Sequence, residues 1–207
     1  MRRKNVKDNL KINLRVGEVN RITSETNIAV SINLDGKGES EVSTGVGFFD
    51  HMLTAFAKHG LFDLYVEVKG DLEVDCHHTI EDTGIALGQA IAIALGDKKG
   101  IHRYGNFILP MDEALVLSAI DLSGRSYLVF DCEFTAEWVG EMKTEMIKEF
   151  FYALSSHGEM NLHLKVLHGS NNHHIAEALF KGFARALSQA VAINPRIDEA
   201  WSTKGSL

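Results

Sequence analysis

The pattern of apolar and polar residues repeats once along the chain. Residues 64–70 (LYVEVKG) and 162–169 (LHLKVLHG) alternate between apolar and polar side chains, which predicts two strands. Each follows a segment with helical spacing of apolar residues that ends at His-Gly, 48–60 and 146–158. Glycine often follows the last turn of a helix, because it adopts the left-handed conformation there without strain. Both regions therefore predict a short helix followed by a strand.

Both predicted strands lead to a double histidine and a long apolar stretch, residues 77–96 and 173–193, which predicts a well-buried helix. Each half also begins with a strand-rich stretch. For these stretches we predict hairpins, one over 26–47 that turns near Asp35-Gly36 and one over 114–134 that turns at Ser123-Gly124.

This shared order predicts a tandem duplication of a ββαβα unit. The corresponding fold class is α+β, an α/β sandwich with the helices packed between the sheets. We divide the chain into an N-terminal arm, a first half-repeat, a second half-repeat and a C-terminal tail that binds substrate: residues 1–14, 15–97, 98–194 and 195–207.

The two halves carry the same metal-binding pattern, two adjacent histidines followed three residues later by glutamate. In a helix, the first histidine and the glutamate lie on one face, one turn apart, so that both can ligate a single ion. The second histidine points roughly 100° away around the helix axis and more naturally serves another ion. Two such motifs therefore predict two metal ions. The motifs are His77-His78-x-x-Glu81 and His173-His174-x-x-Glu177.

The repeat adds one candidate ligand from each short helix, because His51 aligns with Glu149. One consistent partition assigns His51, His78, His173 and Glu177 to one ion, and His77, Glu81, Glu149 and His174 to the other. Mixed imidazole and carboxylate ligation suits Mn, Fe or Zn, and the carboxylates favour Mn.

Cationic and hydroxyl side chains in the second half suggest an anion site. Arg103 follows a glycine-containing loop, and Arg125 lies in a predicted turn. The guanidinium group matches the geometry of phosphate. Ser202, Thr203 and Lys204 follow the last predicted helix. Each residue alone is typical of a solvated surface, but together they favour a phosphorylated substrate.

Composition restricts the class of protein further. A net charge of -7 argues against a nucleic-acid-binding protein. The two cysteines form no CxxC pattern, which fits a reducing compartment, and we predict a cytoplasmic location. Neither a membrane-spanning run nor the apolar segment of a secretory signal is found, so we predict no membrane partner.

Several stretches resemble the imidazoleglycerol-phosphate dehydratase family, over nearly the whole chain from about residue 17. They are GEVNRITSET (17–26), FFDHML (48–53), HHTIEDTGIALGQA (77–90), IDLSGR (120–125), NNHHIAEALFKGFARAL (171–187) and STKG (202–205). The resemblance implies a fold like ribosomal protein S5 domain 2, two Mn ions per active site, and a homo-oligomer of 24 subunits with active sites at subunit interfaces. The implied activity is dehydration of D-erythro-imidazole glycerol phosphate to imidazole acetol phosphate, in histidine biosynthesis.

The resemblance also implies residue roles. The metal ligands of the family match His51 and both double-histidine motifs, while some members have histidine where this chain has Glu149. We predict catalytic roles for Glu25, His51, Glu81 and Glu177. We predict that substrate is bound by Glu25, His51, His59, His77, Glu81, Arg103, Arg125, His173, Ser202, Thr203 and Lys204. His59 precedes glycine at a predicted helix end, where interaction with the helix dipole is an alternative role.

Under this hypothesis, the ions hold the imidazole ring of the substrate as imidazolate, which expels the hydroxyl from the carbon attached to the ring. Loss of the neighbouring C–H proton gives an enol that becomes the ketone. Glu25 is the candidate acid/base or a contact to a substrate hydroxyl, and a turn or helix cap is its structural alternative.

Three other interpretations compete with this one. The first is a binuclear metallohydrolase that acts on a small phosphorylated substrate with the same ligand types. The second is a protein whose metals only hold an oligomer together, although structural sites are often rich in cysteine. The third is a di-iron helical bundle, which expects Glu-x-x-His, the reverse order, on long helices.

Overall fold

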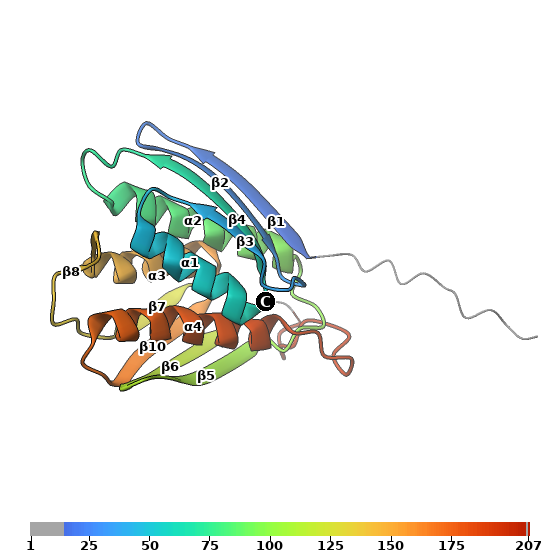
Figure 1. The fold of residues 1–207 in the computed structure, drawn as a ribbon. Coiled ribbons are helices and arrows are strands. Elements are labelled where there is room, and N and C mark those ends of the chain that lie inside the picture. Colours follow the sequence, from blue (N-terminus) through green and yellow to red (C-terminus); the bar gives the residue numbers. More distant parts are fainter. Residues whose placement is uncertain (1–14, 206) are drawn as a thin grey trace, which may run out of the picture.

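The computed structural model describes residues 15–205 and 207, and the predicted arm of residues 1–14 lies outside them. The described residues form two four-stranded sheets with four helices packed between them (Figure 1). No helix in the described part of the chain is both long and apolar enough to cross a membrane.

The first sheet has the strand order β1-β2-β4-β3. β1 pairs with β2, and β2 with β4, in antiparallel fashion, whereas β3 lies parallel to β4. Its strands are β1 (Val16–Ile22), β2 (Thr26–Asn33), β3 (Ser40–Ser43) and β4 (Asp63–Gly70).

The second sheet repeats this topology with the order β5-β6-β10-β7. Its strands are β5 (Tyr104–Met111), β6 (Ala114–Asp121), β7 (Tyr127–Asp131) and β10 (Asn161–His168). A small hairpin, β8 (Trp138–Val139) and β9 (Met142–Lys143), follows β7. Among the described residues, the first half has no counterpart to this hairpin.

The helices pair across the two halves. α1 packs against α4, and α2 packs against α3, so each pair takes one helix from each half. Figure 1 shows this helical layer between the two sheets. The helices are α1 (Gly47–Gly60), α2 (His77–Leu95), α3 (Glu145–His157) and α4 (Asn172–Val191).

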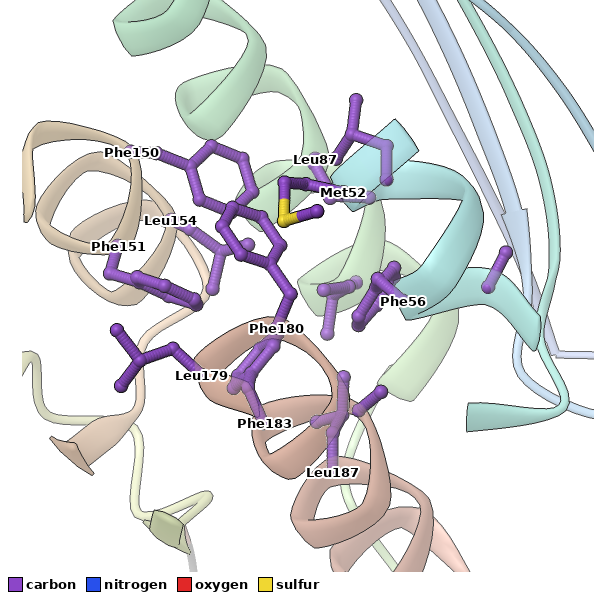
Figure 2. Packing of buried hydrophobic residues seen from close by; sticks show 14 of the residues in the cluster. Met52, Phe56, Leu87, Phe150, Phe151, Leu154, Leu179, Phe180, Phe183 and Leu187 are labelled. Atoms are coloured by element: carbon purple, nitrogen blue, oxygen red, sulfur yellow. The ribbon is translucent and has the colours of Figure 1, made fainter. Parts of the chain in front are cut away.

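The core lies where helices of both halves meet (Figure 2). Phe150 of α3 stacks on Phe180 of α4 with ring centroids 5.2 Å apart, and Phe56 of α1 stacks on Phe183 at 5.5 Å. All four rings are at most 2% exposed. Burying each such side chain contributes about 1.5–3 kcal/mol, so the aromatic centre helps to hold the two halves together.

The α/β sandwich is confirmed, and the ββαβα unit needs one addition. Each half contributes three strands to its sheet before its first helix, and the sequence analysis missed the first of these, β1 and β5. These are the edge strands next to β2 and β6. In β1 only Gly17 is buried, so the strand lacks the apolar alternation that marks a half-buried strand.

The two predicted hairpins are wrong. β2 and β3 lie on either side of β4, and β6 and β7 lie on either side of β10. The residues around Asp35-Gly36 and Ser123-Gly124 therefore connect strands that are not neighbours. The hairpins of this fold are β1–β2 and β5–β6.

Candidate active site

Three predicted ligands from the two halves meet at one place. His51 comes from α1, and His173 and Glu177 lie one turn apart on α4. Glu177 Oε2 is 3.7 Å from His51 Nε2 and 3.2 Å from His173 Nε2. Among the described residues, this is the one group of three in which the candidate ligand atoms all lie within 4.8 Å of one another. We call it the α1–α4 cluster.

The N-terminus of α4 fixes the direction of its histidines. The Asn171 side chain accepts hydrogen bonds from the backbone N–H groups of His173 (2.9 Å) and His174 (3.3 Å), as an N-cap residue does. The ring of Phe48 packs edge-on against His173 at 5.2 Å. The helix start and the aromatic contact together hold His173 toward Glu177.

Glu177 is the buried member of the cluster, with 8% of its surface exposed. Burial acts to raise its pKa, but Lys181, His51 and His173 outweigh this and leave the pKa below its usual value. Lys181 Nζ lies 2.5 Å from Glu177 Oε1. The sequence analysis missed Lys181, although it stands one helical turn after Glu177, a spacing that could have indicated the pair.

The motif of the first half forms the equivalent pair on α2. His77 Nε2 lies 3.4 Å from Glu81 Oε2. Glu149 is half-buried on α3 and forms no group of three with this pair in the described part of the chain. Within one chain, His77 and Glu81 therefore lie together, but Glu149, predicted to share an ion with them, does not join them.

The second histidine of each motif points away from these groups and is held by a carboxylate. His78 Nδ1 lies 2.9 Å from Asp71 Oδ2, and His174 Nδ1 lies 2.7 Å from Glu113 Oε2. These hydrogen bonds raise the pKa of both histidines. Metal-bound histidines commonly use their other ring nitrogen in this way. Nε2 of each ring is therefore the atom that could bind an ion. The sequence analysis missed both Asp71 and Glu113.

Glu25 lies beside the first of these histidines, in the turn between β1 and β2. Its Oε1 atom is 3.8 Å from His78 Nε2, and its side chain is about half exposed. The corresponding turn between β5 and β6 holds Asp112, whose Oδ2 atom is 3.6 Å from His174 Nε2.

The predicted anion-binding residues also come together, in an open cavity of about 520 Å³ that we call the anion pocket. Arg103 is fixed there by two hydrogen bonds to Asp121, from Nε at 2.7 Å and from Nη2 at 3.1 Å. This contact raises the pKa of Arg103. The pocket is lined by Arg103, Tyr104, Arg125, Trp201, Ser202, Thr203, Lys204 and Leu207.

The anion pocket and the α1–α4 cluster lie at opposite ends of α4. His173 and Glu177 stand in its first two turns, whereas residues 201–204 follow its last residue, Val191. At 1.5 Å per residue, the helix between Glu177 and Val191 is about 20 Å long. Figure 1 shows the C-terminal tail beyond the far end of α4. One chain therefore cannot bring both groups to a small substrate.

His59 lies near the C-terminal end of α1 and is half-buried. Burial is the main reason that its pKa is lowered, and the charge of Lys181 adds to the effect. The imidazole is thus favoured in its neutral form. The prediction that His59 binds substrate stays a prediction.

The chain matches known dehydratases over most of its length. A family profile described as Imidazoleglycerol-phosphate dehydratase matches residues 44–187. The imidazoleglycerol-phosphate dehydratase of Acetivibrio thermocellus is 62% identical over 190 residues, which are 92% of this chain and 97% of that protein. The enzyme of the same name from Lachnoclostridium phytofermentans is 59% identical over 193 residues, 93% and 98% of the two chains.

A solved structure agrees with the fold. The crystal structure of imidazoleglycerol-phosphate dehydratase from Staphylococcus aureus superposes with a TM-score of 0.79 at 38% sequence identity. The match covers 86% of this chain and 99% of that one.

Proposed function

Because the chain belongs to the imidazoleglycerol-phosphate dehydratase family, we propose that it converts imidazole glycerol phosphate to imidazole acetol phosphate with two manganese ions, in histidine biosynthesis. The family makes the chain a dehydratase, a hydro-lyase, which decides against the hydrolase alternative. A cytoplasmic location is part of the proposal, in keeping with two free cysteines.

The donor sets of the two motifs fit two divalent ions. Each half supplies a histidine and a glutamate one turn apart, and a second histidine whose Nδ1 is held by a carboxylate. This ligand chemistry suits a first-row metal such as Mn. When bound, such ions would supply positive charge that favours the deprotonated form of the substrate's imidazole ring.

The anion pocket would hold the phosphate of the substrate. Arg125 lies in the turn after β6, and Lys204 follows from the C-terminal tail, so the pocket gathers positive charge from distant parts of the sequence. Arg103 adds a guanidinium that Asp121 already orients. Holding the phosphate would fix the glycerol carbons in the geometry that the reaction requires.

The length of α4 supports an active site shared between copies of the chain. A phosphate in the anion pocket and an imidazole at the α1–α4 cluster would lie about 20 Å apart in one chain, too far for one small substrate. His51 and His173 are also exposed, which leaves them open to another subunit. The proposal therefore includes a homo-oligomer, of 24 subunits by family resemblance, with active sites at subunit interfaces.

Glu25 is the proposed acid/base. The reaction breaks a C–O bond, whose hydroxyl leaves with a proton as water, and removes a proton from the neighbouring carbon. A carboxylate next to one metal-ligating histidine can exchange such a proton at its Oε1 atom. Glu25 lies 3.8 Å from His78, on an exposed turn where substrate can reach it.

Turnover of imidazole glycerol phosphate by metal-stripped protein, before and after addition of Mn, tests this function. We expect the ketone product to form only after Mn is added, with two Mn bound per chain. A fully metallated sample that forms no ketone, or a stripped sample that forms it at the full rate, would contradict the proposal.

A further inference from the structure

The two halves can be compared residue by residue around their hairpins. β1 and β2 pair from Val16–Asn33 onward, and β5 and β6 pair in the same register from Tyr104–Asp121. Both hairpins also touch their long helix in the same way. A Cβ atom on Gly17 would lie 1.8 Å from the carbonyl oxygen of Ala90, and one on Gly105 would lie 1.9 Å from that of Ala186. Equivalent positions can therefore be assigned without ambiguity.

At three of these positions the first half carries a polar network that we call the buried triad: Arg21, Thr26 and Asp82. Arg21 Nη2 lies 3.0 Å from Asp82 Oδ1, and Thr26 Oγ1 donates a hydrogen bond of 2.5 Å to Asp82 Oδ2. Thr26 and Asp82 are 2% and 7% exposed, whereas the side chain of Arg21 is 27% exposed and closes the triad toward the surface. The triad joins the β1–β2 hairpin to α2, the helix that carries His77 and Glu81.

The second half has apolar residues at the same three positions. Leu109 corresponds to Arg21, Ala114 to Thr26 and Ala178 to Asp82, and all three are buried. At these three positions the second hairpin therefore packs on its helix through apolar side chains. Arg21 is only partly buried, and replacing even a fully buried ion pair by apolar residues is often neutral or stabilising. The fold alone does not explain why the first half keeps the triad.

The contacts of the triad lead to Glu25. Thr26 Oγ1 is 3.2 Å from Thr23 Oγ1, which accepts the backbone N–H groups of Glu25 (3.1 Å) and Thr26 (3.0 Å). The carbonyl oxygen of Glu25 in turn accepts the N–H of Asp71 at 3.1 Å, and Asp71 holds His78. A short series of hydrogen bonds thus runs from α2 to the turn that presents Glu25 and back to a candidate metal ligand.

The second half anchors its turn by other means. Glu113 lies directly against its histidine, His174, and also accepts the backbone N–H groups of Ser170 (3.1 Å) and Asn171 (2.7 Å). The side chain of Glu113 fixes this turn by itself. In the described structure the side chain of Glu25 accepts no backbone N–H group, so the turn that carries it needs another anchor.

We propose that the buried triad is a positioning device that fixes the Glu25 turn relative to His78 and the metal-ligating face of α2. Asp82 is its central positioning residue, because it binds both other members. The effect on catalysis rests on the proposed role of Glu25, whereas the effect on the turn itself does not.

The second half supplies the test variant. Arg21→Leu combined with Thr26→Ala and Asp82→Ala gives the first half the residues of the second, so we expect the fold, the oligomer and the melting temperature to be retained. We expect kcat to fall by about tenfold to a hundredfold, as misplacement of a reacting group does, with little change in KM. Hydrogen exchange at the amides of Glu25 and Asp71 should become faster.

A second pair of variants removes the hydroxyl with little change in shape. Thr26→Val should lower kcat and speed exchange in the turn, and Thr26→Ser should restore most of both. Unchanged exchange at Glu25 and Asp71 in the triple variant would overturn the proposal, as would equal exchange at these amides in the Val and Ser variants. Faster exchange with undiminished turnover would support the positioning role of the triad and would show instead that Glu25 takes no part in the reaction.

Discussion

The two halves of the molecule share a strand order and a metal-binding motif, yet their glutamates at the hairpin turns differ. Glu113 accepts hydrogen bonds from His174 and from two backbone N–H groups, which lower its pKa to about 2. Glu25 lies 3.8 Å from the equivalent histidine and has no such contacts among the described residues. The carboxylate of the second half is thus held by three hydrogen bonds, whereas the side chain of Glu25 remains about half exposed.

The halves also differ in how their short helices begin. Glu141, next to the β8–β9 hairpin of the second half, accepts the N–H of Phe48 at 3.0 Å and so caps α1 of the first half. This contact lowers the pKa of Glu141. The duplicated fold thus presents the histidine–glutamate motif twice, with different contacts around each copy.

The largest expected effect comes from removing the glutamate of either histidine–glutamate pair. Glu177→Ala in one half and Glu81→Ala in the other should each cost one Mn equivalent per chain, because each removes the carboxylate of one site. Loss of an outer-shell partner costs about 10–100-fold, so loss of a ligand should reduce turnover by more than about a hundredfold. Metal analysis and turnover check this. If only one variant loses metal, the halves do not each hold an ion.

The two turn glutamates should separate chemistry from structure. Glu25→Gln should retain both metals and the melting temperature but lose about 10²–10⁴-fold in turnover, because a general acid/base contributes about that factor. Glu113→Gln should instead weaken the His174 contact and lower metal retention. Near-normal turnover of Glu25→Gln, with metal content measured in the same sample, would exclude Glu25 from the reaction.

The cap on α1 should have a smaller effect. Glu141→Ala leaves the N–H of Phe48 without its acceptor and should destabilise the protein by about 1 kcal/mol, the usual cost of losing an N-terminal cap. Thermal or chemical unfolding measures this, and Glu141→Gln, which retains an acceptor oxygen, is the matched control. Equal stability of the Ala variant and the parent would show that the cap contributes nothing.

The smallest expected effect is on the pH dependence of stability, to which the first residue of β4 and that of β10 contribute differently. Asp63 at the start of β4 accepts the N–H groups of Lys37 (2.7 Å) and Glu39 (3.1 Å), whereas Asn161 at the start of β10 donates to the carbonyl of Arg125. The Lys37 contact is the main cause that lowers the pKa of Asp63 below 3.8.

A lowered pKa means that the stabilisation by Asp63 is present above pH 3.8 and is lost as the pH falls through the folded-state pKa. Asp63→Asn should therefore flatten the fall in melting temperature below pH 3.8, by about 1–3 °C. Parallel melting curves for parent and variant from pH 5 to 2 would contradict this.

The sequence predicted the parts of the molecule that depend on local spacing. The double histidines and the helices that carry them follow from helical periodicity and the internal repeat. The predicted group of His51, His78, His173 and Glu177 is met for three members, whereas His78 lies against Asp71 instead.

Features that depend on non-local contacts were missed. The partners of β3 and β7 were predicted wrongly, because β4 and β10 enter between strands that are consecutive in sequence. Asp71 and Glu113 were missed because each contacts a histidine through the fold rather than through helical spacing. The buried triad becomes visible only when the two halves are compared in three dimensions.

Mixing two inactive variants tests most directly whether the active site is assembled from different copies of the chain. One parent carries His173→Ala in the α1–α4 cluster and the other Arg125→Ala in the anion pocket, and the two are co-expressed with different tags. Oligomers that contain both chains should regain activity, because some sites then combine an intact cluster with an intact pocket. Verified mixed oligomers as inactive as either parent would contradict a site shared between subunits.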